Sequence, residues 1–265
     1  MSQYRPLSAL VQNRLANAWA DSELARRVML ALESRSHEEV GKPELVRMLA
    51  ELELLAEPAR RPFRRIDVPK TQAKQTVMIL PGFATAPHRM KYLAQHLEQA
   101  GHSTKRWGAG FNWGPTEERF AQMEARLIEI HAAQQTKIVL LGWSLGGLFA
   151  REIAKRHPDK VAKVITLGSP FSGSPRANNM WRVYQFVTGY RVDEPPVKAD
   201  VATKPPVETI AFWSARDGAI APHCAAGLPG ERDRAVRIDC THCGYTYDAG
   251  AILAILRELD RANSN

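Results

Sequence analysis

The sequence contains only three cysteines among its 265 residues, and all three lie beyond residue 220. So few, and an odd number, do not form the disulfide framework of a small secreted domain. No run of about 18 apolar residues occurs, so we expect no membrane-spanning helix. The first residues lack the apolar core and small-residue cleavage site of a secretory signal, so we expect a cytoplasmic location.

Extremes of composition are also missing. Apolar residues make up 45% of the chain and charged residues 24%, which is typical of a globular protein and excludes wholesale disorder or a collagen-like repeat. The length fits one large domain, or one domain with a modest extension. None of the usual nucleic-acid-binding motifs is present, so we expect no nucleic-acid partner.

The net charge of +8 is unevenly distributed along the chain. Residues 1–58 contain seven Lys or Arg against nine Asp or Glu, so the positive excess lies further along. The densest basic stretch is Arg60, Arg61, Arg64, Arg65, Lys70 and Lys74. We interpret residues 61–75 as a solvated basic linker, and weak peripheral contact with an anionic membrane is the alternative.

Residues 1–60 have the pattern of a helical N-terminal extension. Apolar residues recur every three or four positions in three stretches, which predicts three short amphipathic helices. Pro43 suits the first turn of the third helix, and Pro58 is predicted to end it. Such helices cannot bury their apolar stripes alone, so they must dock on one another and on the rest of the chain.

From residue 76 onward, short apolar runs alternate with amphipathic stretches. The runs predict strands at 76–80, 102–107, 137–141, 161–167, 208–213 and 235–238. This alternation predicts an α/β fold over 76–265, with a mostly parallel sheet covered by helices on both faces. The proline-rich segment 170–206 breaks the rhythm, and we interpret it as a cap insertion.

Ser144 is the predicted nucleophile. The sequence Gly142-Trp-Ser-Leu-Gly146 fits the Gly-x-Ser-x-Gly elbow, with an apolar strand before it and a helical stretch after it. The glycines leave room for a sharp turn, on which the serine hydroxyl projects from the sheet edge. The alternative is a serine that merely caps a helix.

A serine hydroxyl needs a base and a group that orients that base. Of the histidines after Ser144, His242 follows the last strand and is the predicted base, with His223 the weaker alternative and His157 too near in sequence. Asp217, just after the strand at 208–213, is the predicted acid, with Asp239 in reserve.

An oxyanion hole requires two backbone donors. Leu145 directly follows the nucleophile and is expected to supply one amide. The loop after the first core strand should supply the other, and we choose Phe83, with Ala84 as the alternative.

At this point the chain resembles an α/β hydrolase of the lipase and esterase kind, and more narrowly a bacterial group of lipase-like hydrolases. The resemblance covers roughly residues 74–262 and rests on the stretches LPGF, RWGAGFNWGPT, LLGWSLGG, TLGSPFSG, WSARDGAIAP and CTHCG. It implies triad roles for Ser144, Asp217 and His242, and oxyanion roles for Phe83 and Leu145. One departure is Pro81-Gly82, where many lipases have His-Gly.

Aromatic residues near these motifs are candidates for the substrate site. We expect Trp181 and Tyr184 to share one side of a short cap helix that forms an acyl-chain wall, with Trp113 and Trp143 also contacting substrate. The alternative is an aromatic patch that only covers the hydrophobic core. A zinc site could be formed by Cys224, Cys240 and Cys243. A metal ion bound to His242 would prevent this histidine from acting as the base, so we expect no metal and no cofactor.

The sequence therefore predicts a serine hydrolase that cleaves small-molecule or lipid carboxylic esters through an acyl-enzyme. An acyltransferase or thioesterase using the same triad is the first alternative. A non-catalytic lipid- or partner-binding hydrolase fold is the second. The oligomeric state and the preferred acyl chain do not follow from the sequence.

Overall fold

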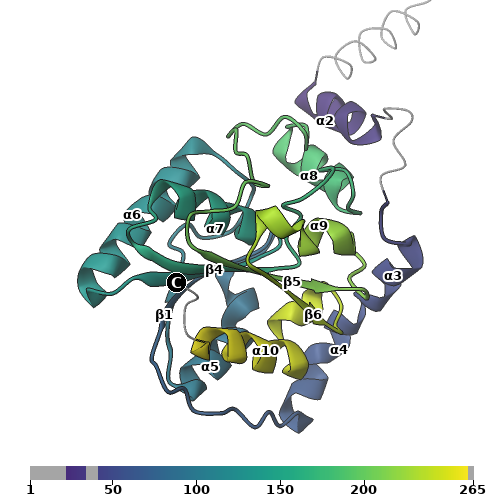
Figure 1. Cartoon of the computed structure of the whole chain (residues 1–265). Helices are drawn as coiled ribbons and strands as arrows, with labels where there is room; N and C mark the ends of the chain where they lie inside the picture. Colours follow the sequence, from purple (N-terminus) through teal and green to yellow (C-terminus); the bar gives the residue numbers. More distant parts are fainter. Residues whose placement is uncertain (1–21, 34–40, 262–265) are drawn as a thin grey trace, which may run out of the picture.

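The computed structural model describes residues 22–33 and 41–261. Its centre is one six-stranded sheet in which every strand pair is parallel, in the order β2-β1-β3-β4-β5-β6 (Figure 1). The strands are β1 (Thr76–Leu80), β2 (Ser103–Arg106), β3 (Ile138–Trp143), β4 (Val161–Leu167), β5 (Glu208–Ser214) and β6 (Arg234–Ile238). This arrangement confirms the predicted α/β fold with a parallel sheet.

Helices cover both faces of the sheet. In Figure 1, α5 and α10 lie below the sheet, while α6 and α7 lie above it. The helices of the hydrolase core are α5 (Lys91–Ala100), α6 (Glu117–Gln134), α7 (Leu145–Arg156), α9 (Pro222–Ala226) and α10 (Ala249–Asp260). Short 3₁₀ turns occur at η2 (Pro87–Met90), η3 (Pro229–Glu231) and η4 (Cys243–Thr246). None of the described helices is long and apolar enough to cross a membrane.

The sheet is buried on both faces because successive strand residues point to opposite sides. In β1, Val77 and Ile79 join the core cluster that includes α5 and α10. Met78 and Leu80 join the cluster formed with α6 and α7. All five residues of β1 are buried, which explains why its sequence is a continuous apolar run rather than an alternating one.

The N-terminal extension contributes three described helices. They are α2 (Glu23–Leu32), α3 (Leu45–Ala50) and α4 (Glu53–Arg60), followed by the 3₁₀ turn η1 (Arg61–Phe63). The first predicted helical stripe lies within residues 1–21, outside the described part of the chain. In Figure 1, α2 lies beside the cap helix α8 (Trp181–Thr188), and Glu51 and Glu53 of the α3–α4 segment contact the loop after β6.

One expectation for this region was wrong. Pro58 does not end the third helix but lies inside α4, where the helix tolerates one missing backbone hydrogen bond and continues to Arg60. The basic stretch 61–75 stays a predicted linker, and it contacts the core at Arg64. Arg64 pairs with the buried Glu57 at 3.0 Å and donates to the Tyr247 oxygen at 2.8 Å, because buried acids and carbonyls of the core need these partners.

The cap segment leaves the sheet after β4 and returns to it at β5. It contains α8, which ends at Gly189 in the left-handed conformation. The return segment is tied down by Arg151 of α7, a fully buried guanidinium that donates to the carbonyl oxygens of Val201 and Ala202 at 2.6 and 3.0 Å. Burial lowers the pKa of Arg151 to about 10.

Candidate active site

Ser144 lies at the sharp turn between β3 and α7. Its φ of 54° is in the left-handed region, which a non-glycine residue adopts only when the surrounding structure enforces it. The flanking glycines explain how. A Cβ at Gly142 would lie 2.3 Å from the Gly146 oxygen, and one at Gly146 would lie 2.3 Å from the Leu80 oxygen. The Gly-x-Ser-x-Gly spacing is therefore a steric requirement of this turn.

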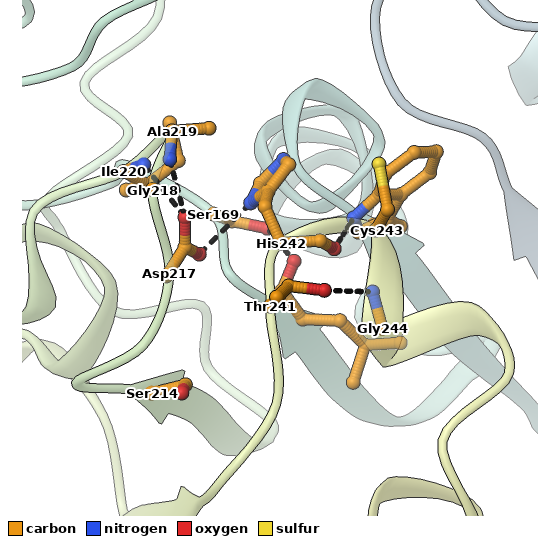
Figure 2. Close-up of polar contacts among 12 residues, drawn as sticks. Ser169, Ser214, Asp217, Gly218, Ala219, Ile220, Thr241, His242, Cys243 and Gly244 are labelled. Atoms are coloured by element: carbon orange, nitrogen blue, oxygen red, sulfur yellow. Dashed lines mark hydrogen bonds and ion pairs between the residues drawn. The ribbon is translucent and has the colours of Figure 1, made fainter. Parts of the chain in front are cut away.

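Asp217 and His242 meet at the same edge of the sheet. Asp217 follows β5 and His242 follows β6, and parallel strands bring their carboxyl ends together. His242 Nδ1 donates to Asp217 Oδ2 at 2.8 Å, and Asp217 Oδ1 accepts from the amides of Ala219 and Ile220 at 2.9 and 2.8 Å (Figure 2). Both oxygens of the Asp217 carboxylate are thus held by hydrogen bonds, and the side chain is buried.

The environment of His242 favours its charged form. Burial by itself would lower the pKa of this imidazole, but the negative charges of Asp217 and Glu51 outweigh that effect, so the net pKa is raised. In this structure the Ser144 hydroxyl and His242 are not joined by a hydrogen bond, and such contacts often tighten only when substrate binds.

The alternative acid and base lie elsewhere. The Asp239 side chain is 82% exposed and faces Arg216 at 3.9 Å, so it belongs to the solvated surface. His223 is exposed on α9, and His157 faces Glu124 at the far end of α7. Of the candidates weighed from the sequence, the structure brings together only Asp217 and His242.

The two predicted oxyanion donors, Phe83 and Leu145, line the same cavity as Ser144. We find no protein acceptor among the described residues for the amides of Phe83 and Leu145. The alternative, Ala84, is excluded as a donor because its amide already donates to the Asn112 oxygen at 2.8 Å. Two amides therefore stay available for an anion.

Asn112 holds the loop that carries Phe83. This side chain is fully buried, donates from Nδ2 to the Pro81 oxygen at 2.8 Å, and accepts at Oδ1 from the Gly114 amide at 3.1 Å. Its backbone amide also donates to the Thr85 oxygen at 2.9 Å. Asn112 thereby holds the loop at Pro81-Gly82 in place.

An apolar cavity of about 250 Å³ opens next to Ser144. Trp181 and Tyr184 of α8 line it, together with Phe83, Leu145 and Phe149. Trp113 and Trp143 do not line it. Trp113 is 56% exposed, and the buried Trp143 donates from its indole to the His242 oxygen at 3.0 Å. Strand alternation accounts for Trp143, which shares its face with Val139 and Leu141, away from the cavity.

Three residues near the site were missed by sequence reasoning. Gly168 has a φ of 54°, and a Cβ there would lie 2.9 Å from Asp217 Oδ2 and 3.1 Å from His242 Nδ1. Ser214 donates to the Cys240 oxygen at 2.6 Å and so joins the end of β5 to the base loop. Glu51 of the N-terminal extension contacts the base loop directly.

The three thiols are free, and Cys224 and Cys240 are buried. Burial raises the pKa of the Cys224 thiol to about 11, so it is protonated at neutral pH. Among the described residues, no cluster of three His, Cys, Asp or Glu side chains is close enough to hold a metal ion. The zinc alternative therefore finds no ligand set in this part of the chain.

Comparison with known proteins supports the fold. The family model described as alpha/beta hydrolase fold matches residues 75–204. The chain has the α/β-hydrolase fold. An α/β hydrolase from the metagenome of lagoon sediments at Mar Chica, Morocco, has a TM-score of 0.52 at 19% identity, covering 71% of this chain and 91% of that one. At this identity the likeness shows the fold.

Curated relatives match over shorter stretches. A pimeloyl-[acyl-carrier protein] methyl ester esterase of Aromatoleum aromaticum is 43% identical over 56 residues, covering 21% of this α/β hydrolase and 20% of the relative. The enzyme of the same name from Vibrio parahaemolyticus is 40% identical over 80 residues, covering 29% of each chain. The chain thus spans less than a third of the length of these relatives.

Proposed function

We propose that this α/β hydrolase cleaves carboxylic esters, with Ser144 as nucleophile, His242 as general base and Asp217 as the group that orients the base. The observation that carries the proposal is the buried 2.8 Å contact between His242 Nδ1 and Asp217 Oδ2, at the sheet edge where Ser144 sits on a strained turn. A neutral imidazole that donates from Nδ1 leaves Nε2 free to accept a proton.

In the first half of the reaction, Ser144 Oγ attacks the ester carbonyl carbon while its proton moves to His242 Nε2. The carbonyl oxygen becomes negative and accepts hydrogen bonds from the amides of Phe83 and Leu145, and the N-terminus of α7 favours the same charge. The carbon–oxygen bond to the alcohol then breaks, and the departing alkoxide takes the proton from the imidazolium. An acyl-enzyme on Ser144 remains.

In the second half, water replaces the alcohol. His242 takes a proton from the water as its oxygen attacks the acyl carbon, and the same two amides bind the oxyanion again. Collapse of this intermediate returns the proton to Ser144 Oγ and releases the carboxylic acid. No metal or organic cofactor enters either half.

The cavity indicates the substrate class. Its walls are mainly apolar, and its volume of about 250 Å³ lies slightly below the usual range for pockets of drug-sized ligands. We therefore propose esters of short or medium acyl chains. The curated relatives are named for a methyl ester, which supports a small alcohol on the other side of the bond.

Labelling with a fluorophosphonate probe tests this proposal. We expect the wild-type protein to be labelled and to hydrolyse p-nitrophenyl butyrate, and we expect Ser144→Ala to lose both properties while keeping its melting temperature. Ser174→Ala, a serine of the cap whose Oγ accepts from the Arg176 amide, is the matched control and should be labelled like the wild type. An unlabelled wild-type protein would point to a non-catalytic hydrolase fold.

Product analysis separates hydrolysis from the two rival activities of the same triad. Incubation of an acyl ester with and without an added alcohol should give the free acid in both cases. A transfer product that dominates when the alcohol is present would instead assign an acyltransferase. A preference for acyl thioesters over matched oxygen esters would assign a thioesterase.

A further inference from the structure

The junction of α3 and α4 lies against both loops that carry the candidate acid and base. Glu51 Oε1 accepts from the His242 amide at 2.6 Å and from the Gly218 amide at 3.2 Å. Glu51 Oε2 accepts from the Cys243 amide at 2.9 Å. Because Gly218 directly follows Asp217, one carboxylate of the N-terminal extension joins the acid loop to the base loop.

Neighbouring residues of the extension strengthen this connection. We call residues 44–53 the catalytic strap. Glu53 accepts from Thr241 Oγ1 at 2.6 Å and from the Tyr247 hydroxyl at 3.2 Å, on the two sides of the base loop. Arg47 donates to the Ala215 oxygen at 2.6 Å, at the start of the acid loop. More than one residue of the strap therefore forms hydrogen bonds with these two loops.

The backbone of the strap lies very close to Gly218 of the acid loop. A Cβ at this position would lie 2.5 Å from the backbone oxygen of Arg47, a contact that backbone atoms cannot relieve. The Asp-Gly pair after β5 is therefore explained by the strap rather than by the turn alone. Asn179 of the cap adds a third partner, since its amide donates to the oxygens of Pro43 and Gly218 at 3.1 and 2.8 Å.

We propose that Glu51 is a positioning residue for the hydrolytic reaction, which fixes His242 relative to Asp217 and stabilises the imidazolium formed when Ser144 is deprotonated. This proposal rests on the proposed function. Three amide donors converge on one carboxylate, and charge-assisted hydrogen bonds of this kind are shorter and stronger than neutral ones. A negative charge beside the base loop acts in the same direction as that of Asp217.

The other groups around His242 do not cancel this effect. The Trp143 ring from β3 and the Tyr245 ring from η4 lie 5.4 and 6.1 Å from the imidazole, between centroids. Burial raises the pKa of Tyr245 well above its ordinary value, so this hydroxyl is neutral at assay pH. Arg89 of η2, whose positive charge would oppose this effect, lies over the Trp143 ring at 6.0 Å and interacts with the Cys243 thiol, yet the pKa of His242 is still raised.

Glu51→Gln tests the proposal. The amide that replaces Oε2 would face the Cys243 N–H donor to donor, so one bond is lost together with the charge. We expect kcat to fall about 10- to 100-fold with KM changed less than threefold, because the acyl cavity is lined by other residues. Loss of the negative charge should also lower the pKa of His242 and move the acid limb of kcat/KM to lower pH by roughly 0.5–1 unit.

Two further variants separate the effect of the Glu51 charge from the effect of its side-chain length. Glu51→Asp keeps the charge on a shorter side chain, so we expect kcat to fall while the acid limb moves less than in Glu51→Gln. Glu129→Gln is the matched control, since this exposed carboxylate of α6 lies outside the strap, pairs with Arg126 of the same helix at 2.7 Å, and should leave both kinetic constants and the acid limb unchanged. Melting temperatures identify any variant that fails to fold.

Hydrogen–deuterium exchange provides a readout that does not depend on activity. In Glu51→Gln we expect faster exchange in both loop segments, 215–220 and 240–244, and unchanged exchange in β3. Faster exchange in a protein without esterase activity would overturn the proposed function but leave the strap intact. A folded Glu51→Gln with wild-type kcat, acid limb and loop exchange would overturn the role of Glu51.

Discussion

The ring of Phe83 lies 5.3 Å from the ring of Tyr184, measured between centroids. Phe83 belongs to the loop after β1 and carries a candidate oxyanion amide, whereas Tyr184 belongs to the cap helix α8. Gly114 also lies close to α8. A Cβ at this position would lie 2.9 Å from Thr188 Cγ2 of that helix. The cap therefore packs on the oxyanion loop as well as lining the cavity.

Replacing both Trp181 and Tyr184 with alanine should change the acyl-chain preference. Each buried methylene of a substrate gains about 0.8 kcal/mol from an apolar wall, so loss of the wall should raise KM for octanoate esters more than for acetate esters. Because Tyr184 also packs on Phe83, we expect a smaller fall in kcat for all chain lengths. A series of p-nitrophenyl esters measures both effects.

Trp113→Ala is the control for this double variant. It removes an aromatic ring of similar size that lies outside the cavity lining and is 56% exposed. We expect its chain-length profile to match that of the wild type. If the folded double variant also keeps the wild-type profile, α8 does not form the acyl wall.

Asp217→Asn should reduce the rate and also change the pH profile. Loss of the charged acceptor disturbs the imidazole tautomer, so kcat should fall on the order of 10³–10⁴-fold. The pKa of His242 is raised by Asp217, so removing that charge lowers it. The imidazole then stays neutral to lower pH, and the acid limb of the residual kcat/KM should move toward lower pH.

Asp239→Asn controls for a general loss of negative charge near the base loop. Its carboxylate is 82% exposed, so we expect less than a twofold change in kcat/KM and no shift of the acid limb. Combining Asp217→Asn with Ser144→Ala should cost little more than Ser144→Ala alone, because triad members act as a unit. Losses that multiply would contradict the assignment of Asp217 to that unit.

Asn112→Ala should weaken oxyanion binding without emptying the acyl cavity. It leaves the Pro81 oxygen and the Gly114 amide without their side-chain partner, at about 1–3 kcal/mol for each buried group. We expect a lower melting temperature and a kcat reduced about 10- to 100-fold, with KM nearly unchanged. A kcat equal to that of the wild type would mean that the loop holds Phe83 without Asn112.

The residues that could be predicted from the sequence are those with a local signal. Ser144 follows an apolar strand and precedes a helix within one short motif, and His242 and Asp217 directly follow predicted strands. Since all six strands are parallel, the order of elements alone brings these three positions to one edge. The fold and the candidate triad therefore required no knowledge of long-range contacts.

No local sequence pattern identified Glu51 as a residue near the site. Its partners lie up to 192 residues away, and nothing in the spacing of a leucine-rich helix indicates which of its acids points inward. Trp143 illustrates the opposite error, because its position beside Ser144 suggested substrate contact while strand alternation turns its ring to the other face. Contacts between distant segments decided both cases.

The strap and α4 have an unusual distribution of side chains. The acids Glu51 and Glu53 bind the base loop and the buried Glu57 pairs with Arg64, whereas several large apolar side chains of the same segment face solvent. The exposed apolar residues are Leu45, Val46, Leu49, Leu52 and Leu55, at 58–78% exposure, and Phe63 of η1, at 89%. Exposed Arg60 and Arg65 flank Phe63. This combination is suited to an anionic lipid surface.

We therefore propose that this face adsorbs weakly to anionic membranes. Each basic side chain near such a surface contributes about 1 kcal/mol, and salt screens that attraction, so sedimentation should show binding to phosphatidylglycerol-containing vesicles at low salt and little at high salt. Phe63→Ser and the double variant Arg60→Ala with Arg65→Ala should each weaken binding. Trp113→Ala, an exposed aromatic on another loop, should not. Equal binding to pure phosphatidylcholine vesicles, or a concentration-dependent dimer that Phe63→Ser abolishes, would assign the face to another partner.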